Sequence, residues 1–201
     1  MQWSISPNNQ VSLIDVMMPF YDFANYGYNG NTPGRGNGPS ITVLIDDPAC
    51  IDFLKKYGYN LKPFVMPRDR DKDNPPVCQK LTLYIRFESR NPPEVIQQIG
   101  TDPDAPMVKL DGMTIGNLGA SQPGAKTVAF VGEGRDMDGY YNYPRVSVLF
   151  NPYTRDRNWR ELGRDHGVTG YVDTLRIRIK ETGRMAFNRM LDGTPEDDLP
   201  F

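Results

Sequence analysis

The sequence predicts an all-β fold with one or two short helices. Glycine and proline contribute 19 and 18 of the 201 residues, whereas hydrophobic residues make up only 38%, and this balance is typical of short strands joined by long loops. Few stretches space their apolar residues as a helix would, and several short stretches are β-branched. A chain of this length can bury a sizeable core in one domain without metal or disulfide support.

The strands are predicted from β-branched runs and from period-two alternation. An apolar and aromatic run occupies residues 11–23, and the short run ITVLI occupies residues 41–45. Residues 80–87 alternate apolar with polar side chains, which indicates a strand with one buried face. Further strands are expected at residues 94–99, 126–131, 145–153 and 169–180.

One helix is predicted directly after the strand at 41–45. Asp46 and Asp47 offer an N-cap, and Pro48 suits the first helical position. The apolar residues that follow are spaced as in a helix until Gly58. Capping therefore explains the aspartate pair better than a role as metal ligands of a nuclease does.

The folded domain is predicted to span residues 1–181, and residues 182–201 to form a flexible linker with an acidic tail. Residues 26–40 are so rich in glycine and asparagine that they must be a loop. The tail ends in three acids and Leu-Pro-Phe, and adjacent acids give a solvated segment that does not join a core. A terminal aromatic ring beside the main-chain carboxylate suits a pocket with a basic rim on another protein.

This tail resembles the C-terminal tip of bacterial single-stranded DNA-binding proteins, in which acids precede an apolar residue, proline and a final phenylalanine. The resemblance implies recruitment of replication, recombination or repair enzymes. The expected partner-binding residues are Glu196, Asp197, Asp198, Leu199, Pro200 and Phe201. The alternative is an ordinary frayed acidic tail.

The net charge of −2 argues at first against a nucleic-acid partner. Four of the 25 acidic residues lie in 192–201, which holds no basic residue, so the rest of the chain carries 23 basic against 21 acidic side chains. Because this excess is small, DNA binding through phosphates would have to come from a local patch.

Such a patch is predicted on the polar face of residues 80–87. Bases can stack on Tyr84 while Lys80 and Arg86 meet phosphates, and neither contact requires a particular sequence. A second basic row on the last predicted strand comprises Arg176, Arg178 and Lys180. The alternative for both rows is a strand face made basic for solubility or to protect a sheet edge.

Aromatic and basic residues in loops are further DNA-binding candidates, because flexible loops with exposed rings can close over an unstacked strand. The loop residues expected to contact DNA are Tyr28, Arg35 and Tyr141. Phe20 and Phe23, which precede the first loop, are expected in the core instead.

Catalytic and cofactor sites are not evident in the sequence. His166 is the only histidine, which excludes a histidine-based metal cluster. Residues 119–127 (GASQPGAKT) nearly match a phosphate-binding loop, but an extra residue precedes the lysine and a strand-like run follows where a helix is required. We therefore expect no enzyme activity, no cofactor and no bound metal.

The order of the segments resembles the OB-fold single-stranded DNA-binding proteins of tailed bacteriophages over residues 10–181. The similar stretches are ITVLIDD, a short helix to KKYGYNLK, LTLYIRF, NPPEVI, and NPYTR followed by GVTGYVDTLRIRIKE. The resemblance implies a five-stranded OB-fold barrel with long loops, which binds a DNA strand through basic and aromatic residues without catalysis. Longer Gly-rich insertions at 27–40 and 112–125 distinguish this chain.

The expected function is coating and protection of single-stranded DNA during phage DNA replication, recombination or repair, with partner enzymes recruited by the tail. Two other classes stay open: a non-enzymatic virion or scaffolding protein, and a metal-dependent nuclease. A homo-oligomer is compatible with the sequence.

A cytoplasmic location is expected, in an infected bacterial host if the protein is phage-encoded. Cys50 and Cys78 are far apart and lack CxxC spacing, which favours a reduced, intracellular protein. Neither a signal peptide nor a membrane-spanning run is evident.

Overall fold

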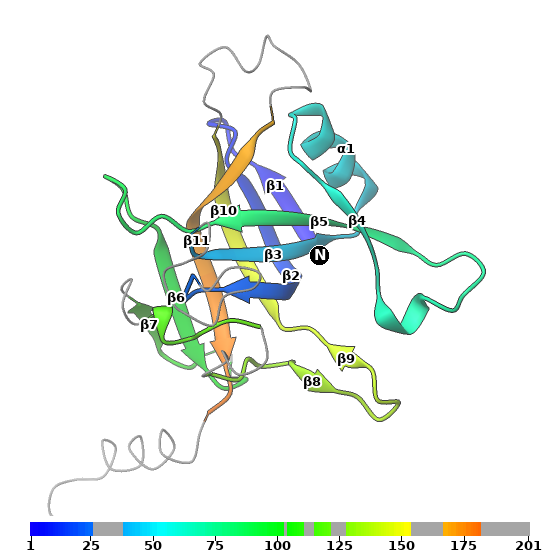
Figure 1. Cartoon of the computed structure of the whole chain (residues 1–201). Helices are drawn as coiled ribbons and strands as arrows, with labels where there is room; N and C mark the ends of the chain where they lie inside the picture. Colours follow the sequence, from blue (N-terminus) through cyan, green and yellow to red (C-terminus); the bar gives the residue numbers. More distant parts are fainter. Residues whose placement is uncertain (26–37, 103, 111–114, 122–127, 154–166, 182–201) are drawn as a thin grey trace, which may run out of the picture.

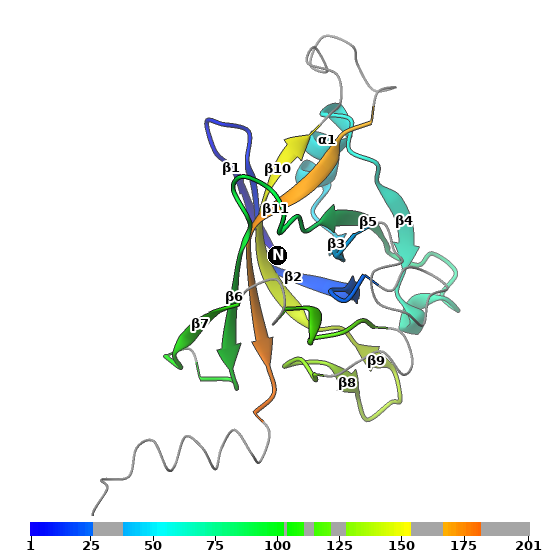
Figure 2. The same cartoon turned by 60° about the vertical axis from the view of Figure 1, so that its left-hand side comes forward.

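The computed structural model describes residues 1–25, 38–102, 104–110, 115–121, 128–153 and 167–181, and its strands confirm the all-β prediction (Figures 1 and 2). In chain order the elements are β1 (Gln2–Ile5), β2 (Val11–Asp22), β3 (Ser40–Ile45), α1 (Pro48–Lys56), β4 (Lys62–Val65), the 3-10 turn η1 (Pro67–Asp69), β5 (Val77–Tyr84), β6 (Glu94–Ile99), β7 (Met107–Leu110), β8 (Gly134–Arg135), β9 (Tyr141–Asn142), β10 (Arg145–Tyr153) and β11 (Thr169–Ile179). Strands β6 and β10 have the bounds that the sequence predicts.

Five strands close into a barrel. Their hydrogen-bonded order is β5-β3-β2-β10-β11, with antiparallel neighbours along this path. The barrel closes where the start of β11 pairs in parallel with the end of β5, through Gly170 opposite Leu83 and Tyr171 opposite Tyr84. This five-stranded barrel is an OB-fold, so the predicted fold is confirmed.

The other strands extend the barrel at its margins. Strand β4 pairs with β5, β1 pairs with β2, β6 runs parallel to β11, and β7 continues from β6. Strands β8 and β9 form a separate hairpin. In Figures 1 and 2 this hairpin and the β6–β7 pair lie at the end of the barrel opposite to α1.

The barrel interior is filled by the inward residues of alternating strands. In β5, Leu81 and Leu83 are buried and Thr82 between them is exposed, as the alternation predicts. The largest fully buried side chains include Phe23, which was expected in the core, and Phe150. The order of apolar and polar residues along each strand therefore decides which side chains remain for the outer surface.

The predicted strand at 126–131 is wrong in its described part. Of residues 128–131, only Phe130 forms an isolated bridge, to Ile179 of β11. Gly132, with φ at +79°, turns the chain directly afterwards, so no second pair can follow. The strand predicted at 80–87 is β5, which ends three residues early at Tyr84.

Helix α1 begins and ends as predicted. The Asp47 side chain accepts a hydrogen bond from the backbone N–H of Cys50 at 2.8 Å, and Pro48 lies in the first turn of the helix. Cys50 and Leu54 bury their side chains in the barrel core. Of the helices in the described ranges, none is long and apolar enough to cross a membrane.

Both cysteines are free thiols and both are buried. Burial, together with the nearby carboxylates of Asp47 and Asp46, raises the pKa of the Cys50 thiol to about 12. The pKa of Cys78 is also raised, chiefly by burial. These thiols are packing groups of the core rather than reactive ones.

Gly170 permits the close approach that shuts the barrel. A Cβ atom at this position would collide with Cδ2 of Leu83 and would lie 3.1 Å from Cδ2 of Phe150. Both neighbours are fully buried, and the close packing of a protein core resists their displacement. A side chain at residue 170 would therefore push β11 away from β5.

We expect Gly170→Ala to lower the free energy of unfolding by about 1–3 kcal/mol, the usual cost of overpacking a core. Urea denaturation followed by circular dichroism measures this change. Gly116→Ala is the matched control, because a Cβ there meets nothing within 4 Å and should leave the midpoint nearly unchanged. Equal midpoints for the two variants would show that the closing contact is not tight.

Candidate nucleic-acid interface

Strand alternation leaves a polar row on the outside of the barrel where β3 and β5 pair. Thr42 of β3 lies opposite Thr82 of β5, and their hydroxyl oxygens are 3.1 Å apart. In the same register, Ser40 lies opposite Tyr84. Hydroxyl groups and a ring therefore form the middle of this face.

A cluster of rings around a cation lies at the end of this row where the barrel closes. The guanidinium carbon of Arg86 is 3.9 Å from the ring centre of Tyr171 and 5.6 Å from that of Tyr153. Tyr171 in turn lies 6.3 Å from Tyr84 and 5.2 Å from Tyr153, between ring centres. Such distances are those of cation–π and edge-to-face ring contacts. We call these four residues the Arg86 cluster.

A second cluster lies at the other end of the row. The Lys80 ammonium is 5.7 Å from the ring centre of Phe20 and 5.4 Å from that of Phe64, and the two rings meet edge to face. Phe64 continues to Tyr143, with 6.3 Å between ring centres. We call these four residues the Lys80 cluster. Lys62 of β4 lies directly opposite Lys80 in register and adds a second positive charge.

Two shallow hollows connect the clusters. One, of about 290 Å³, is lined by residues that include Phe20, Thr42, Lys62, Lys80 and Tyr84. The other, of about 240 Å³, is lined by residues that include Tyr84, Arg86 and Tyr171. No described carboxylate lines either hollow. We call the whole surface, from Tyr143 through the Lys80 cluster, Thr42 and Thr82 to the Arg86 cluster, the aromatic track.

Phe20 is part of the aromatic track, so its predicted place in the core is wrong. Its side chain is 44% exposed. The pairing of β2 with β3 shifts register between Met17 and Phe20, and Met18 and Pro19 are both buried in succession. This irregularity reverses the alternation, so Phe20 points outward and Tyr21 inward.

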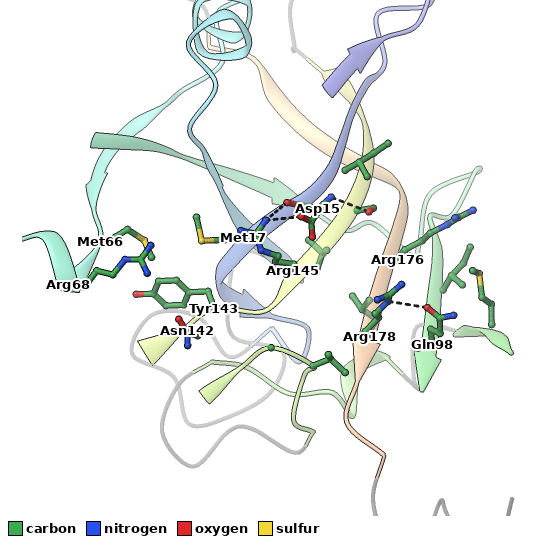
Figure 3. A pocket seen from close by; sticks show the side chains of 18 residues that line it. Asp15, Met17, Met66, Arg68, Gln98, Asn142, Tyr143, Arg145, Arg176 and Arg178 are labelled. Carbon is green, nitrogen blue, oxygen red and sulfur yellow. Dashed lines mark hydrogen bonds and ion pairs between the residues drawn. The ribbon is translucent and has the colours of Figure 1, made fainter. Parts of the chain in front are cut away.

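Three predicted DNA-binding residues, Lys80, Tyr84 and Arg86, lie together on the aromatic track. Arg176 and Arg178 are exposed as expected, but they line a separate groove beyond it (Figure 3). The side chain of Lys180, also exposed, donates a hydrogen bond to the backbone carbonyl of Glu133 at 2.7 Å. The predicted contacts that lie outside the described residues are Tyr28, Arg35, Glu196, Asp197, Asp198, Leu199, Pro200 and Phe201.

Tyr141 lies on the β8–β9 hairpin, and its hydroxyl donates a hydrogen bond to the Glu133 carboxylate. Glu133 is buried, and its other carboxylate oxygen accepts a hydrogen bond from the backbone N–H of Phe130 at 3.1 Å. Burial and this carboxylate raise the pKa of Tyr141 well above its usual value. Tyr141 thus ties β9 to the residue that directly precedes β8, while its ring lies 5.6 Å from that of Tyr143.

Of the track residues absent from the predicted DNA contacts, only Thr82 lies on β5; the others come from β2, β3, β4, β10, β11 and the loop before β10. The full set is Phe20, Thr42, Lys62, Phe64, Thr82, Tyr143, Tyr153 and Tyr171. The alternation of Leu175, Ile177 and Ile179 would place Tyr171 on the inward side, and only the register shift in the pairing of β10 with β11 turns its ring outward. Burial raises the pKa of Tyr143, against the opposing charge of Arg70, so its ring carries no negative charge at neutral pH.

The aromatic track offers rings, cations and hydroxyls. Planar rings can stack on bases, and ammonium or guanidinium groups can bind phosphates. Within the described ranges, no three histidine, cysteine or carboxylate side chains are grouped as a metal site would require. The chemistry of this surface is that of binding an anionic, aromatic ligand.

No protein-family model matches the sequence, and no curated protein matches it. Among solved structures, the chain is similar to the single-stranded DNA-binding protein from bacteriophage Enc34 in complex with ssDNA, with a TM-score of 0.42 and 14% identity over 90% of this chain and 92% of that one. A C-terminal truncation of the Enc34 protein gives a TM-score of 0.41 and 14% identity over 90% of this chain and 91% of that one. Another structure of the Enc34 protein gives a TM-score of 0.40 and 12% identity over 90% of this chain and 92% of that one. The interpretation of the aromatic track therefore depends on its own residues.

Proposed function

We propose that this protein binds single-stranded DNA along the aromatic track, largely independently of base sequence. The observation that carries the proposal is the continuity of the track. Rings, cations and hydroxyls follow one another from Tyr143 through Lys80 and Tyr84 to Tyr153, and no described carboxylate lines the hollows between them. Stacking on such rings contributes about 1–3 kcal/mol per base whatever the base is.

The opposed lysines favour an anionic ligand. Lys62 and Lys80 face each other across adjacent strands, where like charges destabilise a sheet. A phosphate group placed between them would remove this repulsion. Phe20 and Phe64 beside Lys80 provide stacking surfaces for the neighbouring bases.

A single strand suits the track better than a duplex does. Tyr84, Tyr171 and Phe20 present ring surfaces, and only unstacked bases can lie against them. The OB-fold binds oligonucleotides on the face formed by its second and third strands and the loops beside it. In this chain those strands are β3 and β5, which carry Thr42, Thr82 and Tyr84.

We propose further that the protein acts without catalysis in phage DNA replication, recombination or repair, in the cytoplasm of an infected bacterium. Its acidic tail, residues 196–201, would recruit partner enzymes through the acids and the terminal Leu-Pro-Phe. A metal-dependent nuclease and a virion or scaffolding protein are the alternatives that the experiments below separate.

We expect an oligothymidine of about 15 nucleotides to bind tightly and a matched duplex to bind weakly, with affinity falling as salt is raised. Quenching of intrinsic fluorescence, or anisotropy of labelled DNA, measures both. Absence of single-strand binding would favour a structural protein. Cleavage of the oligonucleotide in Mg²⁺ would favour the nuclease.

Tyr84→Ala should weaken oligothymidine binding roughly 5- to 150-fold, the equivalent of one lost stack of about 1–3 kcal/mol. The matched control is Tyr140→Ala, because Tyr140 is an exposed tyrosine that lies outside the track. Anisotropy titrations of both variants give the comparison. Equal losses in the two would show that the track is not the binding surface.

Removing Phe201 should abolish capture of a replication or recombination enzyme from host extract while leaving DNA affinity unchanged, because the aromatic ring is lost and the new terminal carboxylate, on Pro200, has no ring beside it. Pull-down with immobilised protein, followed by mass spectrometry, measures the loss. Gly193→Ala, which keeps the terminal acids and ring, serves as the control. Equal recovery with intact and shortened chains would contradict a docking role for the tail.

A further inference from the structure

A larger groove lies on the outside of the barrel beyond the aromatic track (Figure 3). It has a volume of about 610 Å³ and runs over β2, β10, β11 and β6. Four arginines line it: Arg68, Arg145, Arg176 and Arg178. We call it the arginine groove.

The arginines far outweigh the acids in this groove. Asp15 is the one carboxylate among the described lining residues, and it pairs with Arg145 at 2.9 Å. Arg178 donates from Nε to the side-chain oxygen of Gln98 at 3.1 Å. Arg176 makes no side-chain hydrogen bond or ion pair with any described residue. The groove therefore keeps an excess of positive charge that suits an anionic occupant.

The arginines follow one another along the groove. Arg176 of β11 lies opposite Ser147 of β10, and two residues further along the two strands are Arg178 and Arg145. Figure 3 shows Arg68 near Tyr143 at one end, Arg145 in the middle, and the other two at the far end. Guanidinium groups placed in a row fit a chain of phosphates better than they fit a single anion.

The same groove has apolar surface between its arginines. Ile14 and Met107 are about half exposed, at 46% and 52%, and Met17 and Ile96 lie beside them. Nucleobases pack well on aliphatic and thioether side chains as well as on rings. The groove therefore offers arginines for the phosphates of a nucleotide chain and apolar side chains for its bases.

Tyr143 joins the arginine groove to the aromatic track. It lines the groove, and its ring also lies 6.3 Å from that of Phe64 in the Lys80 cluster. A polymer that occupies the track can thus pass over Tyr143 and enter the groove without leaving the protein surface. A short acidic peptide would have no need of this connection.

We propose that the arginine groove binds a second segment of the same DNA strand, which continues from the track across Tyr143 with its phosphates on Arg145, Arg176 and Arg178. This inference rests on the proposed function, because it assigns the track to single-stranded DNA. It makes the DNA path turn from the β3–β5 face to the β10–β11 face. The binding site is then longer than the track alone provides.

The test compares DNA lengths in the full-length protein. Oligothymidines of about 6 nucleotides should fill the track alone, and those of about 20 nucleotides should also reach the groove. Arg176→Ala/Arg178→Ala should change the dissociation constant of the short strand less than twofold and weaken the long strand tenfold or more. It should also lower the slope of log K against log salt by about 1.4 for the long strand only, because two phosphate contacts are lost.

The matched control is Lys55→Ala/Lys56→Ala, which removes two positive charges from the last turn of α1. Because total charge changes equally, a general electrostatic effect would weaken both double variants alike, and that result would overturn the proposal. Arg176→Lys/Arg178→Lys should restore part of the long-strand affinity. Thermal unfolding by circular dichroism verifies that the exposed substitutions leave the fold intact.

Two outcomes separate the inference from the proposed function. If wild-type protein binds both strands and Tyr84→Ala weakens them, but the arginine variant binds the long strand normally, the groove inference is wrong and the proposed function stands. If wild-type protein binds neither strand, both are wrong. A labelled peptide of residues 192–201 tests whether the groove binds an acidic peptide instead. If Arg176→Ala/Arg178→Ala abolishes peptide binding but leaves long-strand affinity unchanged, the groove is assigned to an acidic peptide and the proposal is overturned.

Discussion

The parallel contact between β5 and β11 is the constraint on which the rest of the structure depends. At this contact Gly170 lets the two strands approach over Leu83 and Phe150, and the barrel interior is sealed. The next residue pair in the same register is Tyr171 opposite Tyr84, on the outer side. One short pairing therefore closes the core and also sets the two tyrosines side by side on the surface. Core packing at Gly170 and the surface position of Tyr171 therefore depend on the same two consecutive residue pairs.

Local sequence signals predicted the elements but not their closure. The alternation in β5 and β11 and the Asp47 cap of α1 depend on residues close together in the chain, so they could be identified from the sequence. The contact of Leu83 with Gly170 joins residues far apart, and no periodicity indicates it. The reversal at Phe20 was also hidden, because a register shift arises from pairing with the neighbouring strand.

The binding surface was predicted only as far as one strand extends. Lys80, Tyr84 and Arg86 share a strand or its end, so alternation alone placed them on one face. Phe64 and Tyr171 join them through tertiary contacts that the sequence does not reveal. The basic row at Arg176 and Arg178 was correct in its exposure, but β11 leaves β5 after Tyr171 and continues beside β6, which carries that row to another side of the barrel.

The stacking of Arg86 on Tyr171 has an entropic consequence. Arginine has many rotamers, and immobilising its side chain costs up to about 2 kcal/mol. At 3.9 Å from the ring centre, the guanidinium of Arg86 already lies in one orientation in the free protein. Much of the loss of rotamer freedom thus occurs when the chain folds and not when a ligand arrives. This end of the surface is preorganised, so its contact with a phosphate retains a larger fraction of the intrinsic interaction energy.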